Sequence, residues 1–447
     1  MSRKTLSTSI IGLALALMLL TACGTPEPPP AVIQATSTSA PAITTPTEVP
    51  APTEEVVNEP SPSASTLSKA TRHALFIQTW MFVNDLYVYP DYGGLNWEAV
   101  EEEYTEKVTN AASDEEFYDL MREMIDLLGD EHSAFLSPDV VRLQNAIYES
   151  LEIPGGIGAY LSEVDGEILL VQVFPDSPAF EAGLQPGERI VAIDGVPRQQ
   201  FASVDEAILA MIGEVGTEVV LTVQSVHGVE RQVPVRRAVV DLENALVQGR
   251  LIEDTRLGLL VLGGFDSPQV TQVVRETLAE LISGEALEGL IVDVRANPGG
   301  DVDTLLDTLA LFVDGGSIGY RVGRNEAYDL LIPEGESMPE LEGLPVVVLI
   351  GPQTSSAGEC FAAGMQLHKR ATILGMPSAG NTEYVSSLQL SDGSELSLAE
   401  WVYELPDGAL LEGRGVQPDV LVQMDWWLYR ANDDPQIQAA IELLGSE

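Results

Sequence analysis

The first folded part of the chain shows apolar residues at helical spacing. Residues 73–86 and 117–128 carry this pattern, and the second segment opens after Ser113, a residue type that favours the N-cap position. It stops at Gly129, where a short polar turn follows. The pattern therefore predicts an N-terminal helical region over residues 67–150.

Residues 151–240 change to a pattern of short strands around one helix. The helix is expected at 204–212, and the strands are expected at 168–173, 189–193 and 218–224. Residues 241–447 alternate strands with helices, which predicts an α/β domain. Its expected strands are 257–262, 289–294, 346–350 and 371–374, and its expected helices are 270–281, 302–313, 359–369 and 437–444. The predicted fold class is α+β multidomain, with an N-terminal helical region, a β-rich module and an α/β core.

The first 66 residues read as an export signal and a tether. Arg3 and Lys4 precede an apolar run at 10–20, which is typical of a signal peptide. The run ends in Leu-Thr-Ala-Cys, which resembles a bacterial lipobox and implies a lipoprotein signal peptide over 1–23 with lipidation at Cys23. The alternative is an ordinary signal peptide with an incidental cysteine. Residues 24–66 are Pro/Thr/Ser-rich without an apolar period, so we expect a disordered tether.

The composition limits the classes of partner. The chain has 69 acidic and 22 basic residues, for a formal net charge of −47. This charge argues against nucleic acid as a partner and favours solubility. The other cysteine, Cys360, lies in an apolar helix and is expected to be buried. The chain shows no metal motif and no nucleotide-binding motif, so we expect no cofactor and no metal.

Ser356 stands between a predicted strand and a predicted helix. At such a junction a serine hydroxyl is exposed beside the N–H groups of the helix N-terminus, which can hold the oxyanion of an acyl-transfer reaction. The alternative is structural, because Ser356 and Glu359 also form the Ser-x-x-Glu pattern of a capping box.

A glycine-rich loop opens the β-rich module. Residues 155–158 precede a strand, and the segment 177–195 leads into the next one. Together they resemble a PDZ domain of the type associated with bacterial proteases. The resemblance implies that the loop at Gly156, Ile157 and Gly158 receives a peptide C-terminal carboxylate while the adjacent strand edge pairs with the peptide. The alternative is a loop that only turns the chain.

Several motifs stand in a fixed order along the chain. They are the turn Asp130-Glu131-His132-Ser133, the PDZ-like module, Asp293-x-Arg295-x-Asn297-Pro298-Gly299-Gly300, Ser356-Ala357-Gly358-Glu359, and Gly413-Arg414-Gly415-Val416-Gln417-Pro418-Asp419. The set resembles the tail-specific, or C-terminal processing, serine proteases. The resemblance implies that Ser356 is the nucleophile and that the oxyanion hole is formed by Gly299 or Gly300 together with Ala357. Asp293 and Arg295 are expected to pair and fix the end of a strand.

One position departs from the family pattern. The usual base of the family is a lysine, and Asn381 stands at that position, where an amide cannot accept the proton. Lys369 and His368 lie at the far end of the helix that follows Ser356, about 20 Å away at 1.5 Å per residue. Neither can replace the lysine.

The chain is similar to the neighbouring tricorn-core branch, which uses a histidine base. That resemblance implies His132 as the base and Glu412 as its acidic partner. The branch has a serine before the histidine, whereas this chain has Glu131, so either Glu131 or Glu412 could orient the ring. The alternative for His132 is a turn histidine satisfied by local backbone.

The sequence thus predicts an extracytoplasmic, membrane-anchored serine endopeptidase. Its substrates are expected to be unstructured polypeptides with free C-termini, gripped by the PDZ-like module. The rival interpretation is a catalytically inactive lipoprotein that binds peptides or other ligands, which Asn381 favours. A third is an esterase or amidase acting on small molecules, which leaves the PDZ-like module without a purpose.

Overall fold

The computed structural model describes residues 67–130, 132–142, 155–164, 166–201, 204–240, 245–284, 286–429 and 433–445. The predicted signal peptide with Cys23, the predicted tether and Glu131 lie outside these residues. Within them, none of the helices combines the length and the apolar character needed to cross a membrane.

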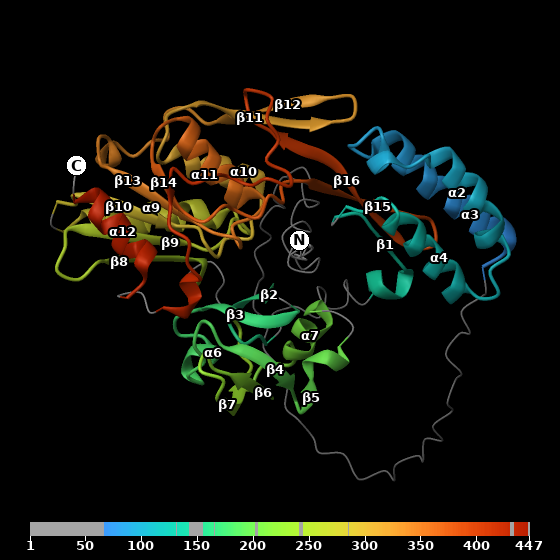
Figure 1. Ribbon diagram of the computed structural model, residues 1–447, viewed down its shortest axis with the longest axis horizontal. Coiled ribbons are helices and arrows are strands. Elements are labelled where there is room, and N and C mark those ends of the chain that lie inside the picture. Colours follow the sequence, from blue (N-terminus) through green and yellow to red (C-terminus); the bar gives the residue numbers. More distant parts are fainter. Residues whose placement is uncertain are drawn as a thin grey trace, which may run out of the picture.

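Three helices form a layer at one end of the molecule (Figure 1). They are α2 (Lys69–Leu86), α3 (Trp97–Thr109) and α4 (Asp114–Asp126). Ser113 caps α4, and its side chain accepts a hydrogen bond from the Glu116 N–H at 3.1 Å, which confirms the predicted helix start. The apolar spacing at 73–86 and 117–128 therefore marks true helices.

The β-rich module is a single antiparallel sheet with the strand order β2-β3-β4-β6-β7, and β5 pairs with β4. It lies below the rest of the molecule in Figure 1, with β2 and β3 nearest the core. Its strands are β2 (Ala159–Val164), β3 (Glu167–Val173), β4 (Arg189–Ile193), β5 (Val196–Pro197), β6 (Glu218–Gln224) and β7 (Glu230–Arg236), and its helices are α6 (Pro178–Glu181) and α7 (Val204–Met211).

A six-stranded sheet in the order β17-β14-β13-β10-β9-β8 forms the core, parallel except for β8. The strands are β8 (Val247–Leu251), β9 (Leu257–Leu262), β10 (Gly289–Asp293), β13 (Val346–Ile350), β14 (Thr372–Gly375) and β17 (Val420–Leu421). The helices are α9 (Gln269–Ile282), α10 (Val302–Ala310), α11 (Ala357–Leu367) and α12 (Pro435–Leu444).

Helices cover both faces of this sheet, which explains its continuous apolar strands. Leu290 and Val292 of β10 pack on the face covered by α9, α10 and α11, whereas Ile291 packs on the face covered by α12. In parallel strands that are buried on both faces, apolar residues do not alternate with polar ones. The strand and helix predictions for this domain are therefore confirmed.

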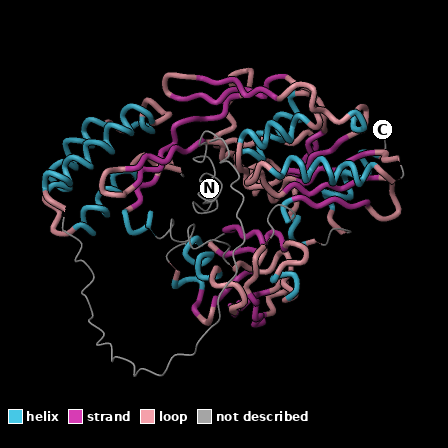
Figure 2. The backbone as a smooth tube through the Cα atoms, turned by 180° about the vertical axis from the view of Figure 1, so that it is seen from behind, coloured by secondary structure: helices cyan, strands magenta, loops and turns pink. Residues whose placement is uncertain are grey.

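A second, antiparallel sheet joins the core to the helical layer, as the view from behind shows (Figure 2). Its order is β1-β16-β11-β12, and β15 pairs with β16. Its buried residues, such as Phe135 and Leu396, pack against α2, α3 and α4. The strands are β1 (Ala134–Leu136), β11 (Gly316–Gly323), β12 (Ala327–Ile332), β15 (Tyr384–Gln389) and β16 (Glu395–Glu404).

The PDZ-like module packs against the core through its β3 strand. Leu169 and Val171 contact Ala296 and Trp427 in one buried apolar cluster. Ala296 lies in the loop that follows β10, between Arg295 and Asn297. The module therefore touches the segment that leads to Gly299 and Gly300.

Candidate active site

Ser356 stands at a strained turn between β13 and α11. It is the N-cap residue of α11, with φ 51° and ψ −124°. This is a sparsely populated region for a residue with a side chain and costs of the order of 1–3 kcal/mol. Among the described helices, the other residues that cap a helix through their side chains have extended backbone: Ser68, Asn96, Ser113, Ser177, Asp301 and Asp434. A helix cap alone does not require the strained conformation of Ser356.

The capping-box pattern also has a second role here. Glu359 is fully buried, and its carboxylate ties the start of α11 to the loop 378–381. It accepts hydrogen bonds from the Ser356 N–H at 3.2 Å, the Ser378 O–H at 2.6 Å, the Gly380 N–H at 2.8 Å and the Asn381 N–H at 2.8 Å. Burial raises the pKa of Glu359 to about 7, although the hydrogen bonds from Ser378, Asn381 and Gly380 act in the opposite direction.

Gly299 brings the loop after β10 against Ser356, and the neighbouring Gly300 lies against the Phe265 backbone. A Cβ atom on Gly299 would lie 2.7 Å from the Ser356 Cβ and 3.0 Å from the Ala357 N. The Gly299 N–H donates to Asn297 Oδ1 at 2.8 Å. In the part of the chain that the structure describes, neither the Gly300 N–H nor the Ala357 N–H donates a hydrogen bond. Of the two predicted glycine donors, the Gly299 N–H is engaged by Asn297, whereas the Gly300 N–H has no partner among the described residues.

The segment 381–383 meets both Ser356 and Glu412. The Asn381 carbonyl accepts from the Ser356 N–H at 2.8 Å. The Thr382 N–H and O–H donate to Glu412 Oε2 at 2.6 Å and 3.2 Å. Glu412 thus binds the residue next to Asn381 and helps to hold this segment beside the nucleophile candidate.

His132 meets the end of the same segment. Its Nε2 lies 3.6 Å from Glu383 Oε2, and both side chains are 3% exposed. The backbone N–H of His132 donates to Asp130 Oδ1 at 2.9 Å, whereas the buried Nδ1 has no hydrogen-bond partner in the part of the chain that the structure describes. The imidazole is therefore not satisfied by local backbone, as the alternative interpretation required. Burial lowers the pKa of His132, and the nearby Asp130 carboxylate offsets part of this shift.

The structure thus gathers Ser356, His132 and Glu412 around one short segment. No hydrogen bond joins Ser356 to His132 in the described chain. Sequence reasoning missed Glu383 and the loop-holding role of Glu359. No motif pointed to Glu383, because its proximity to His132 depends on how distant segments pair.

The excluded bases are placed as expected. Asn381 is 5% exposed, and its Oδ1 has no hydrogen-bond partner. His368 caps the far end of α11, where its Nε2 lies 3.1 Å from the Ser317 carbonyl oxygen. Cys360 is buried in the first turns of α11, as predicted.

Asp293 and Arg295 form a buried ion pair, as expected. Arg295 Nη2 lies 2.7 Å from Asp293 Oδ2, and its Nη1 lies 2.7 Å from Asp434 Oδ2. Because Asp434 caps α12, the guanidinium fastens the end of β10 to that helix.

The PDZ-like loop supplies some of the backbone N–H donors that were predicted for it. The Gly156 N–H donates to the Ala238 carbonyl at 2.9 Å. In the described part of the chain, the N–H groups of Ile157 and Gly158 donate to no other group. Two of the three predicted loop residues therefore have a donor available for a carboxylate.

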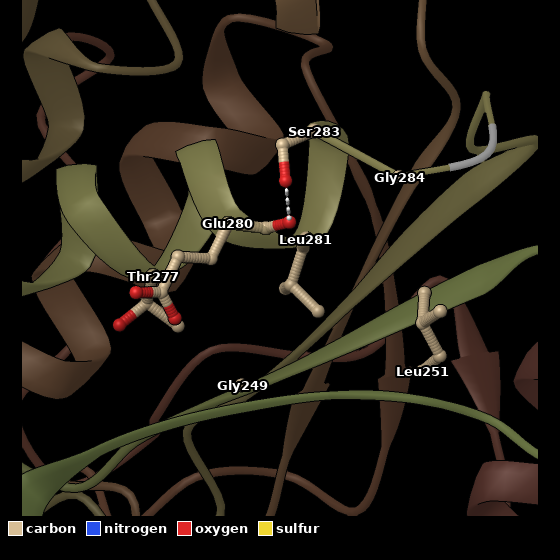
Figure 3. A pocket seen from close by; sticks show the side chains of 7 residues that line it. All are labelled: Gly249, Leu251, Thr277, Glu280, Leu281, Ser283 and Gly284. Atoms are coloured by element: carbon tan, nitrogen blue, oxygen red, sulfur yellow. Dashed lines mark hydrogen bonds between the residues drawn. The ribbon is translucent and has the colours of Figure 1, made fainter.

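A cavity of about 220 Å³ lies elsewhere, between β8 and the end of α9 (Figure 3). Gly249, Leu251, Thr277, Glu280, Leu281, Ser283 and Gly284 line it. None of these is a predicted site residue. Among the described residues, no group of three or more His, Cys, Asp or Glu side chains could hold a metal ion.

Comparison with known proteins gives three domain matches. Residues 256–422 match peptidase family S41, residues 68–126 match the tricorn protease C1 domain, and residues 170–225 match a PDZ domain. The chain is 29% identical over 390 residues to a carboxyl-terminal-processing protease of Synechocystis sp., covering 85% of this chain and 88% of the relative. It is 26% identical over 336 residues to the carboxy-terminal processing protease CtpB of Bacillus subtilis, covering 73% of this chain and 66% of the relative.

A solved structure shares the fold. A photosystem II D1 C-terminal processing protease aligns with a TM-score of 0.63 and 24% identity, covering 79% of this chain and 93% of that one. The mixed α+β architecture with N-terminal helices, a PDZ domain and a protease core is thereby confirmed.

Proposed function

We propose that this chain, which is a C-terminal processing serine protease with a PDZ domain, cleaves unstructured extracytoplasmic polypeptides with Ser356 as nucleophile and His132 as base. The observation that supports this most is the strained backbone of Ser356 beside two available N–H donors. Strain that a helix cap does not need is characteristic of functional positions.

The chemistry follows the logic of acyl transfer. The Ser356 hydroxyl oxygen attacks the scissile carbonyl carbon, and its proton passes to His132. The N–H groups of Gly300 and Ala357 stabilise the oxyanion. His132 then protonates the leaving amine, and water hydrolyses the acyl enzyme. Catalytic hydrogen bonds often form only with substrate bound, so the separation of Ser356 and His132 in this structure is compatible with these roles.

A histidine base fits this chain better than a lysine base. Asn381 occupies the position expected for the lysine, and its amide is not basic. His132 and Glu412, the residues that the resemblance to the tricorn-core branch suggests as base and acidic partner, contact the same segment, 381–383. We therefore assign the chain to the histidine-base branch.

The PDZ domain is proposed to select substrates by their C-termini. The Ile157 and Gly158 N–H groups can receive a terminal carboxylate. Strand β2 ends its sheet and pairs only with β3 among the described strands, so a peptide can add to its other edge.

The proposed location is the cell envelope. Lipid at Cys23 would hold the protein at a membrane, and the Pro/Thr/Ser-rich tether would separate the protease from the surface. Polypeptides outside the cytoplasm would then be its substrates.

The nucleophile is tested by Ser356→Ala in the purified protein. We expect loss of hydrolysis of an unfolded protein and loss of labelling by a fluorophosphonate probe, with the fold retained because only one hydroxyl is removed. Gln417→Ala, at the surface after the Gly-Arg-Gly turn, is a control that should retain activity. Wild type that neither hydrolyses nor reacts with the probe would favour the inactive, ligand-binding alternative.

A further inference from the structure

The imidazole of His132 faces a buried carboxylate that no sequence motif singled out. Glu383 Oε2 lies 3.6 Å from His132 Nε2, and both side chains are 3% exposed. A carboxylate so far from water is stable only with a compensating donor or cation. A neutral imidazole can supply such a donor and a protonated imidazole such a cation, and the 3.6 Å separation places Nε2 within ion-pair range of the carboxylate.

Glu383 is held firmly in this orientation. The Tyr89 O–H, from the segment after α2, donates a hydrogen bond to the other oxygen, Oε1. Two residues earlier, the Asn381 carbonyl accepts from the Ser356 N–H at 2.8 Å. The backbone that carries Glu383 is therefore fixed to the nucleophile candidate, while its carboxylate is fixed between a phenol and the imidazole.

We propose that Glu383 is the positioning residue for His132. Its carboxylate holds the proton of His132 on Nε2, so that Nδ1 remains unprotonated as the nitrogen that accepts the proton from Ser356. This inference rests on the proposed function, and it assigns to Glu383 the orienting role for which the sequence suggested Glu131 or Glu412.

The environment of the ring supports this assignment. Nδ1 is buried and has no hydrogen-bond partner among the described residues, as expected for a nitrogen kept ready to accept a proton. The other carboxylate near the ring, Asp130, is bound to the backbone N–H groups of His132 and Ser133 and to the Tyr87 O–H. The Glu412 carboxylate binds Thr382. Among the described carboxylates, Glu383 is the one that the structure pairs with an imidazole nitrogen, at 3.6 Å.

The first test measures His132 directly, without activity. In the full-length Ser356→Ala protein, the ring pKa of His132 is followed by NMR, and its signals are identified by their loss on His132→Ala. Glu383→Gln removes the negative charge and keeps the shape, so the pKa of His132 should fall. An unchanged pKa would overturn the proposal.

The second test measures the kinetics of peptide hydrolysis in protein that retains Ser356. Glu383→Gln should lower kcat by about tenfold or more with little change in KM, and should move the acidic limb of the pH profile to lower pH. Tyr89→Phe, which leaves Glu383 in place, should give a smaller fall of the same kind. Glu395→Gln is the matched control, because Glu395 is a buried glutamate on β16 and should show neither effect.

The outcomes separate the two hypotheses. Activity that survives Ser356→Ala or His132→Ala contradicts the proposed function. If activity needs both Ser356 and His132, the proposed function stands. If Glu383→Gln then matches Glu395→Gln in kcat and in the acidic limb of the pH profile, only the role of Glu383 is contradicted. If Glu383→Gln does not fold, the Tyr89→Phe kinetics decide: a normal kcat and acidic limb would refute the proposal.

Discussion

At the scale of single residues, backbone conformation bears on two explanations that the sequence left open. Ser356 fits both a cap and a nucleophile by residue type and position. Its φ of 51° differs from the extended backbone of the side-chain caps elsewhere in the described chain. The strand, the turn and the helix around Ser356 were predictable from local pattern, whereas its strain was not.

The roles of His132 and Asn381 can be separated by mutation. His132→Ala should abolish hydrolysis, because it removes the only proposed proton acceptor. Asn381→Ala should cost much less, since the amide cannot take the proton and the backbone contacts of residue 381 remain. Comparable losses of kcat in the two variants would contradict the histidine-base proposal.

The pH dependence follows from the burial of His132. Burial lowers its pKa from the usual 6.5, so the ring stays neutral at neutral pH and gains a proton only on acidification. Activity in the wild type should therefore fall below roughly pH 6, as the base becomes protonated. A pH profile of kcat that stays flat down to pH 4 would argue against His132 as the base.

At the scale of elements, apolar patterning predicted the parallel sheet but missed the antiparallel one. Strands such as β10 and β13 are buried on both faces and read as continuous apolar runs. Strand β16 carries Glu395, Glu400 and Glu404 among its apolar residues and packs on two different cores, so no simple alternation marks it. Its pairing with β1 sets the position of His132, because Ala134 lies opposite Ser397. Such long-range register is not encoded in local pattern.

The junction of β10 and α12 depends on one buried cation. Arg295 is 1% exposed and binds both Asp293 and Asp434. Arg295→Met would leave two buried carboxylates without their partner, so we expect the free energy of unfolding to fall by about 3–5 kcal/mol. Arg122→Met is the control: its pair with Asp119 is about half exposed and should contribute at most about 1 kcal/mol. Urea denaturation of the three proteins measures this, and equal midpoints would contradict the structural role of Arg295.

At the scale of the whole molecule, the proposed tail-binding and catalytic sites lie in neighbouring domains. Leu169 and Val171 of the PDZ domain pack on Ala296, next to the loop that carries Gly299 and Gly300. A polypeptide with a free C-terminus should therefore be cleaved faster than the same polypeptide with an amidated C-terminus, because amidation removes the charge that the loop binds. A short peptide that spans only the cleavage site should be insensitive to amidation. Equal rates for the two long substrates would show that the domain does not recognise tails.

The membrane anchor is the prediction that concerns the chain as a whole, and it falls on residues that the structure does not describe. The acidic chain, with a formal net charge of −47, would be repelled by anionic headgroups. Attachment is therefore expected to require lipid at Cys23, since acyl chains together provide stable anchoring.

Cells producing wild type or Cys23→Ser should differ on fractionation, with the variant released from the membrane or left unprocessed. Cys360→Ser is the matched control, because it changes the buried cysteine of α11 and should stay with the membrane like wild type. If all three proteins sediment equally with membranes, a contact other than lipid at Cys23 holds the protein there.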